Sequence, residues 1–208
     1  MHARAPRPRQ LSVRIMKSRN RLALLLGLAL AASACLGAPS LAQKSDAAAR
    51  SAQIAELSRA GKYSEAIPLA QRLLADMEQA HGPVHRDVAA SLNNLALLYG
   101  SQGRDAEAEP LLKRSIALVE KLHGLGSSEA AHQLNNLAAL YQRQQRYAEA
   151  EPLFRRSLAI REKTLGRGHP DVAQSLNNLA THYEKQGRHA DSDRRGRVAL
   201  RIGDCASQ

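Results

Sequence analysis

The chain has 208 residues, of which 30 are Lys or Arg and 19 are Asp or Glu, so its formal net charge is +11. Seven of the basic residues fall within the first 42. The remainder therefore carries 23 basic and 19 acidic side chains (30 − 7 = 23), a charge of about +4 that argues against nucleic-acid binding. Aromatic residues make up only 3% while Leu and Ala dominate, so we expect stability to come from helix stacking.

The first 42 residues have the layout of a secretory signal peptide. A basic stretch at 16–21, which begins with Met16 as an alternative start, leads into an apolar run at 22–34. This order of a basic and a hydrophobic region, followed by small residues before a cut, is typical of exported proteins. We therefore predict cleavage after Ala42 and a periplasmic location in a bacterium with two membranes.

Two alternatives to simple cleavage stay open. The stretch 32–35 resembles a lipoprotein signal, in which Cys35 would carry the lipid and place the protein on the outer membrane, although Ala32 stands where Leu is usual. The second alternative is an uncleaved inner-membrane anchor, because the stretch 22–43 carries no charge and a spanning helix needs about 20 apolar residues. Membrane contact is expected only in these two cases.

Three segments of the remaining chain repeat at a spacing of 42 residues. The sequence Leu-Asn-Asn-Leu-Ala occurs at 92–96, 134–138 and 176–180. A fixed period of this length indicates a stacked repeat array. The predicted divisions are a signal at 1–42, a divergent first repeat at 43–85, full repeats at 86–127 and 128–169, a degenerate last repeat at 170–202 and a tail at 203–208.

Each repeat contains the pattern of two amphipathic helices. In the first, Leu92, Leu95, Ala96 and Tyr99 are spaced as i, i+3, i+4 and i+7, which places them on one helical face. A break follows near position 103. The second helix has its own apolar face, formed by Ala108, Leu111, Leu112, Ser115, Ile116 and Val119.

Proline, glycine and aspartate suggest where these helices begin and end. Matching prolines are expected in the first turn of each second helix, at Pro68, Pro110 and Pro152. Matching glycines suit the caps at the ends of the second helices, at Gly82, Gly124 and Gly166. The N-caps of two following first helices are predicted at Asp87 and Asp171.

The last repeat departs from the pattern. Gly196 stands where the two full repeats have Leu112 and Phe154, and Arg194 replaces the proline. Gly inside a helix costs on the order of 1 kcal/mol relative to Ala. We therefore expect a short, loosely packed final helix that covers Leu176, Leu179 and Tyr183 poorly. This end would either fray or dock on another chain, so the oligomeric state stays open.

These residues together resemble a known family. The pattern combines His-Pro-Asp-Val-Ala at 169–173, Leu-Asn-Asn-Leu-Ala, a following Tyr, Gly-Arg, Ala-Glu-Pro-Leu, and Glu-Lys-x-Leu-Gly at 162–166. It is similar to the tetratricopeptide repeat in the 42-residue form of kinesin light chain and many bacterial proteins, over roughly 46–202. The resemblance implies an all-α, right-handed α-solenoid.

The resemblance also implies a binding groove along the first helices. The residues it assigns to a peptide are Asn93, Asn94, Leu97, His132, Asn135, Asn136, Ala139, Arg143, Gln174, Asn177, Asn178, Thr181 and Lys185. An Asn side chain both donates and accepts hydrogen bonds, so it can pair with a peptide backbone of any sequence. The alternative is that one Asn of each pair bonds to the backbone of the neighbouring repeat, and repetition alone does not separate the two.

No catalytic motif accompanies the repeats. The sequence has no phosphate-binding glycine loop, no Cys-x-x-Cys and no His-Glu-x-x-His. His81 and His85 flank a Gly-Pro turn instead of sharing a helix face, so we predict no metal, no cofactor and no enzyme. We predict a non-enzymatic module that binds a protein or peptide. The alternatives are a structural or lipid-anchored subunit of a cell-envelope assembly and an enzyme with an unrecognised site.

Overall fold

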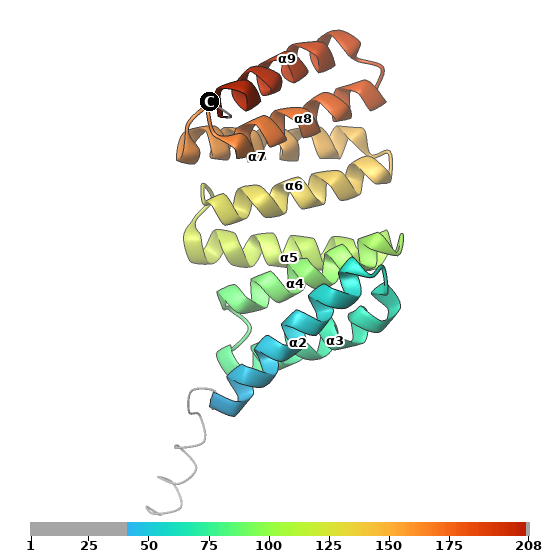
Figure 1. Cartoon of the computed structure of the whole chain (residues 1–208), viewed down its shortest axis with the longest axis vertical. Coiled ribbons are helices and arrows are strands. Elements are labelled where there is room, and N and C mark those ends of the chain that lie inside the picture. Colours follow the sequence, from blue (N-terminus) through green and yellow to red (C-terminus); the bar gives the residue numbers. More distant parts are fainter. Residues whose placement is uncertain (1–40, 207–208) are drawn as a thin grey trace, which may run out of the picture. The chain divides into compact units, whose positions relative to one another are not determined.

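The structure, a computed structural model, describes residues 41–206, and every regular element in that range is a helix. The eight helices in it are α2 (Leu41–Arg59), α3 (Tyr63–His81), α4 (Arg86–Ser101), α5 (Asp105–His123), α6 (Ser128–Arg143), α7 (Tyr147–Leu165), α8 (Pro170–Lys185) and α9 (His189–Ala206). Each packs mainly on the helices before and after it in the chain (Figure 1). The predicted all-α array of stacked helix pairs is confirmed. Residues 1–40, with most of the predicted signal and Cys35, lie outside the described residues.

The core follows the 42-residue pattern. Leu92 is completely buried, and its counterparts Leu134 and Leu176 expose only 1% and 4% of their surface. Ala96 and its counterparts are also buried, and their small side chains let the partner helix approach closely. Full burial of a Leu side chain stabilises a fold by about 1.5–3 kcal/mol. The predicted apolar faces therefore form the core. Within the described part of the chain, no helix is both long and apolar enough to cross a membrane.

The turn inside each repeat depends on a residue with positive φ. Gly103 has φ +73°, and its amide donates to the carbonyl of Gly100 at 3.1 Å. The amide of Arg104 reaches back to the carbonyl of Tyr99 at 3.0 Å. These two bonds form a Schellman motif that satisfies the last carbonyls of the first helix. Gln145 occupies the same place with φ +60°, a conformation that costs a residue with a side chain about 1–2 kcal/mol.

The prolines lie deeper in the second helices than predicted. α3, α5 and α7 begin five residues before Pro68, Pro110 and Pro152, so each proline is in the second turn instead of the first. A proline there leaves the carbonyl four residues earlier without its helical donor. In each repeat that earlier residue is exposed, so water can replace the missing donor.

The second helices end in glycine, as predicted. Gly82, Gly124 and Gly166 are the C-caps, with φ between 79° and 85°. Their ψ values of 154–170° place them in an extended region with positive φ, not in the left-handed helical region. Only glycine adopts this region readily.

The predicted N-caps were wrong. α4 is capped by His85, whose Nδ1 accepts a hydrogen bond from the amide of Asp87 at 3.2 Å, and His169 caps α8 in the same way through Asp171 at 3.1 Å. Ser127 caps α6 through its hydroxyl. Each Asp is the second helical residue, where its carboxylate interacts favourably with the positive end of the helix dipole.

The final helix is longer than predicted. α9 spans 18 residues, and it packs against α8. Ala199 of α9 is 3% exposed, and Leu176, Leu179 and Tyr183 expose at most 4%. The expectation of a short helix giving poor cover was therefore wrong, because burial against α8 outweighs the low propensity of Gly196. Fraying or docking of this end stays a prediction.

Candidate peptide-binding face

The predicted binding residues all lie on α4, α6 and α8, and together they form what we call the first-helix face. Eight of these side chains are exposed: Asn94, Leu97, His132, Arg143, Gln174, Asn177, Thr181 and Lys185. Four are half-buried: Asn135, Asn136, Ala139 and Asn178. Asn93 is buried, with 7% of its surface exposed. The face is therefore accessible along most of its length, but its asparagines do not share one environment.

Four of the six asparagines connect neighbouring repeats. The Asn136 Nδ2 amide donates to Oδ1 of Asn93 at 2.9 Å, and the Asn178 Nδ2 amide donates to Oδ1 of Asn135 at 2.8 Å. The second Asn of one repeat thus reaches back to the first Asn of the repeat before it. The alternative considered from the sequence was a bond from one Asn to the backbone of the neighbouring repeat, but the observed bonds join two side chains. These four side chains have a structural role.

Asn94 and Asn177 are the two asparagines at the ends of this series. Among the described residues, neither side chain forms a hydrogen bond. Asn94 has no counterpart of the Asn136–Asn93 bond within the described residues, because the position 42 residues before Asn93 holds Ser51, whose hydroxyl donates to the carbonyl of Ala47 in its own helix at 2.9 Å. The amide and carbonyl groups of the Asn94 side chain are therefore available to a ligand.

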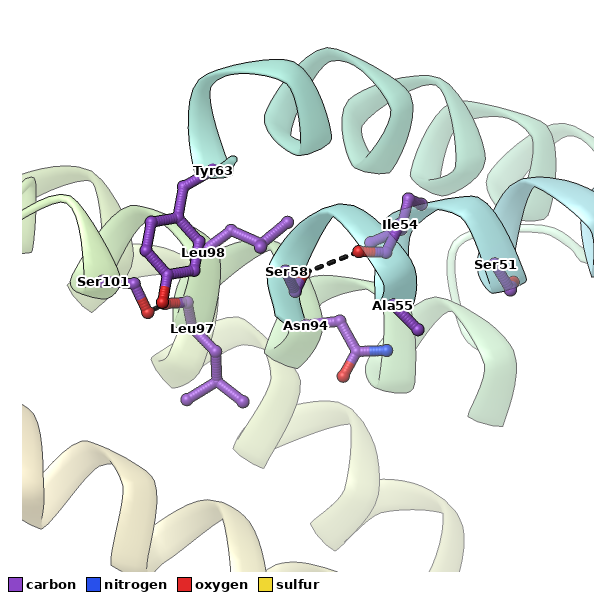
Figure 2. A pocket seen from close by; sticks show the side chains of 9 residues that line it. All are labelled: Ser51, Ile54, Ala55, Ser58, Tyr63, Asn94, Leu97, Leu98 and Ser101. Carbon is purple, nitrogen blue, oxygen red and sulfur yellow. Dashed lines mark hydrogen bonds between the residues drawn. The ribbon is translucent and has the colours of Figure 1, made fainter. Parts of the chain in front are cut away.

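A hollow of about 300 Å³ opens beside Asn94, between residues of α2, α3 and α4 (Figure 2). Its lining consists of Ser51, Ile54, Ala55, Ser58, Tyr63, Asn94, Leu97, Leu98 and Ser101. The hydroxyls of Ser58 and Ser101 donate to the carbonyls of Ile54 and Leu97 at 2.6 and 2.9 Å. Leu97 is 44% exposed, which is high for a large apolar side chain. The hollow is thus an apolar surface with the Asn94 amide at its edge.

The first-helix face becomes cationic toward the later repeats. The position of Ser101 in α4 is taken by Arg143 in α6 and by Lys185 in α8. The Arg143 Nη2 group donates to a carboxylate oxygen of Asp105 at 2.6 Å. It lies over Gly100, where a β-carbon would come within 2.6 Å of the guanidinium. Arg143 is therefore held between two repeats, whereas Lys185 extends into solvent.

His132 lies on the same face and stays uncharged at neutral pH. Although the side chain reaches solvent, the surrounding protein lowers the pKa of His132 by excluding water from the ring, and the nearby Arg161 lowers it further, against a weaker effect of Asp171. Arg161 is itself 6% exposed and donates to the carbonyl of Asp171 at 3.0 Å and to the hydroxyl of Ser175 at 2.9 Å. A neutral His132 can both donate and accept.

A recurring Tyr–Arg–Glu cluster, which the sequence analysis did not assign, also connects the repeats. The Arg146 guanidinium lies 4.0 Å from the ring centre of Tyr141. Both side chains donate to the carboxylate of Glu109, at 2.7 and 3.0 Å. The hydrogen bond from Lys113, then those from Arg146 and Tyr141, lower the pKa of Glu109 to about 2. An equivalent cluster surrounds Glu151. The sequence shows Arg five residues after Tyr99, Tyr141 and Tyr183, but it does not show which carboxylate they share.

His182 is a second residue that the sequence analysis missed. It is completely buried on α8, at the position where α6 carries Leu140. Its Nδ1 lies 3.2 Å from Oε1 of Gln142, and its Nε2 lies 2.7 Å from Nε2 of Gln186. A neutral ring protonated on Nδ1 satisfies both bonds, and burial lowers the pKa of His182 accordingly.

Antiparallel helix pairs that repeat every 42 residues, each packed on the next, define a helical-repeat protein. A comparison with protein-family models gives a match to the tetratricopeptide repeat over residues 45–121 and 129–203. The chain therefore belongs to the tetratricopeptide repeat family. Domains of this family are typically non-catalytic modules for protein–protein interaction. A comparison with curated protein sequences found no match.

Solved structures include several similar repeat arrays. BtubC (BKLC) from P. vanneervenii is similar with a TM-score of 0.71 and 24% identity, over 77% of this chain and 64% of that one. This chain thus spans slightly less than two thirds of BtubC. A kinesin-light-chain-like protein from Podosopora anserina, whose TPR-like repeats are nearly identical to one another, is similar with a TM-score of 0.67 and 25% identity, over 74% of this chain and 73% of that one. A single-substitution variant of that protein is similar with a TM-score of 0.68 and 23% identity, over 77% of this chain and 76% of that one. These likenesses support the fold.

Proposed function

We propose that this chain binds an extended segment of a partner protein along the first-helix face, with the hollow between α2 and α4 as its main anchor point. The observation that carries the proposal is the combination of exposed Leu97, an apolar hollow and an Asn94 side chain that forms no hydrogen bond to any other described residue. An apolar side chain of the partner would enter the hollow, and its backbone would pair with Asn94. Binding sites commonly combine an apolar surface with a few polar groups of this kind.

The asparagines at 93, 135, 136 and 178 are assigned a different role in this proposal. Because they bond to one another across repeats, they fix the spacing of α4, α6 and α8 and have little free capacity for a ligand. The ligand contacts beyond the hollow then come from the other exposed residues of the face, which are His132, Gln174, Asn177, Thr181 and Lys185.

Capture of a partner by two single variants tests the proposal. The wild-type chain, immobilised at its C-terminus, retains its partner from an extract of the source cell, and mass spectrometry identifies and quantifies it. Leu97→Thr introduces the residue that α8 carries at this position, so we expect normal folding but at least about tenfold less partner, as for loss of a central apolar contact. Asn94→Ala should weaken capture in the same direction.

The matched control is Leu125→Ser. Leu125 is 65% exposed in the turn before α6, and it does not line the hollow. This variant removes exposed apolar surface elsewhere, and it should capture the partner normally. Equal loss in the control and in Leu97→Thr would contradict the proposal, as would full capture by Leu97→Thr.

Export is a separate proposal that rests on the sequence of residues 1–42 alone. The basic and apolar stretches support a cleaved signal and a periplasmic protein, and Cys35 supports the lipid-anchored alternative within an envelope assembly. N-terminal sequencing of the mature protein decides between them. A chain that starts at Gln43 supports cleavage, a modified Cys35 supports the lipoprotein, and an intact N-terminus contradicts both.

A further inference from the structure

Two imidazoles and one carboxylate meet at the joint between α3 and α4. His81 is the last residue of α3, His85 caps α4, and Asp87 is the second residue of α4. Each can offer one ligand atom, and these atoms all lie within 4.8 Å of one another. The Asp87 carboxylate oxygen is 3.7 Å from Nε2 of His81 and 3.5 Å from Nδ1 of His85. The side chains are 24%, 36% and 47% exposed, so an ion can reach them from solvent.

The local backbone brings these groups together. Gly82 has φ +79°, and this turns the chain away from the axis of α3 immediately after His81. The short turn that follows places His85 over His81, so that the two rings stack with centres 4.3 Å apart and planes 15° apart. Both rings therefore face the same carboxylate.

Other joints of the array lack this combination. At the joint between α5 and α6, His123 matches His81, but the positions of His85 and Asp87 hold Ser127 and Glu129. At the joint between α7 and α8 the first imidazole is absent, because the position of His81 holds Leu165. One histidine is enough to cap a helix, as His169 does for α8, so capping does not account for the second imidazole at the α3–α4 joint.

We propose that His81, His85 and Asp87 form a binding site for a divalent transition-metal ion of the zinc class. Two imidazole nitrogens and one carboxylate are ligands that zinc favours, and water would supply the fourth. Ligand atoms around a tetrahedral zinc are separated by about 3.3 Å, given bond lengths near 2.0–2.1 Å. The two histidine–carboxylate separations, 3.5 and 3.7 Å, are close to this value. The stacked rings would rotate out of their parallel arrangement so that both nitrogen lone pairs point at the ion. Magnesium and calcium prefer sites made entirely of oxygen ligands.

Such an ion would join the end of the first helix pair to the start of the second. In its absence, Nδ1 of His85 accepts the Asp87 amide at 3.2 Å. Metal binding would use that lone pair and release the Asp87 amide, which lies in the first turn of α4 and belongs to a residue whose side chain is 47% exposed. The ion would thereby hold α3 and α4 at a fixed angle and stabilise the folded array by binding only to it.

Titration of the full chain, with no affinity tag, tests the site. We expect zinc chloride to bind with one equivalent by isothermal titration calorimetry and to raise Tm in a concentration-dependent manner, with reversal by EDTA. His81→Leu, which introduces the residue found at 165, and His85→Ser, which introduces the cap found at 127, should each weaken zinc binding by more than about tenfold. Both should keep the wild-type circular dichroism spectrum, because the array already uses these residues in the same positions.

His123→Leu is the matched control, since it removes the equivalent histidine at a joint that has no second imidazole. It should bind zinc as tightly as the wild type does. Magnesium chloride should give no heat and no shift in Tm. The proposal is overturned if the wild type binds no zinc, or if His81→Leu and His85→Ser bind it as tightly as His123→Leu does, since the ion would then lie elsewhere.

Discussion

Replacing Asn136 by Ala should destabilise the array, whereas replacing Asn94 by Ala should not. The two residues occupy equivalent positions, but only Asn136 donates to Asn93, at 2.9 Å. Asn93 is 7% exposed, so water cannot readily take the place of the lost amide. A buried polar group left without its partner costs about 1–3 kcal/mol, and we expect a loss in this range for Asn136→Ala. Asn94 is exposed and its side chain bonds to none of the residues that the structure describes, so for Asn94→Ala we expect a change within about 0.5 kcal/mol.

Urea unfolding followed by circular dichroism measures both free energies of unfolding. Because repeat arrays do not always unfold in one step, the curves are fitted with a nearest-neighbour model that assigns the loss to an interface. A double-mutant cycle with Asn93→Ala isolates the bond between the two side chains, and it should give a coupling of about 0.5–1.5 kcal/mol. Equal losses for Asn94→Ala and Asn136→Ala, or a coupling of zero, would refute the division into structural and ligand-binding asparagines.

Three further predictions concern single residues. The pKa of Glu109 is lowered to about 2 from an ordinary value near 4.5, so the ionised carboxylate stabilises the fold above pH 4.5, and this stabilisation is lost as the pH falls toward 2. Acid unfolding should show a fall of up to about 3 kcal/mol in the free energy of unfolding over this range, and Glu109→Gln should abolish that fall. The pKa of His182 is lowered because the ring is buried, so the unfolded chain takes up the proton first and stability should fall below pH 6.5 by up to about 1.4 kcal/mol per pH unit. His182→Leu, the residue at 140, should remove that dependence, measured as Tm against pH. Gln145→Gly should raise the free energy of unfolding by about 0.5–1 kcal/mol, because relief of strain exceeds the added chain entropy, while Gln144→Gly in the same turn should lower it.

The sequence was sufficient to predict the repeat architecture and its core. Leu92 and its counterparts recur at a fixed spacing, and in a stacked array this places them in equivalent buried environments. A residue type that recurs at the same position of each repeat therefore has the same burial in each, so the predicted core does not depend on any single position. The same reasoning fails wherever one repeat differs from the others, as at His182, where a polar ring replaces a core Leu.

The roles of the asparagines could not be read from the sequence. Asn93 and Asn94 are adjacent and recur together, yet one is buried and the other exposed. The burial and bonding of the two side chains depend on how α6 packs against α4. This packing brings together Asn136 and Asn93, which are 43 residues apart, instead of equivalent residues 42 apart. The missing partner of Asn94 depends in turn on α2, where the Leu-Asn-Asn-Leu-Ala stretch is absent.

Local propensity gave the wrong N-caps and the wrong length for the last helix, and both errors have a physical reason. Asp is a favoured N-cap, and the prediction placed Asp87 there, but the cap is His85, two residues earlier, whose imidazole accepts the backbone amide of Asp87. Gly196 and Arg194 suggested a weak final helix, yet α9 extends over 18 residues. Packing against α8 supplies the stability that propensity alone does not.

Site-specific photo-crosslinking tests the central claim most directly. A photoreactive phenylalanine analogue is introduced at position 97, beside the hollow, and in a separate protein at position 200 of α9, where Leu200 is 68% exposed. The proteins are irradiated in the source cell, and the adducts are identified by mass spectrometry. The account predicts that position 97 crosslinks to one segment of a partner protein and that position 200 does not. Adducts at position 200 with none at position 97 would contradict it.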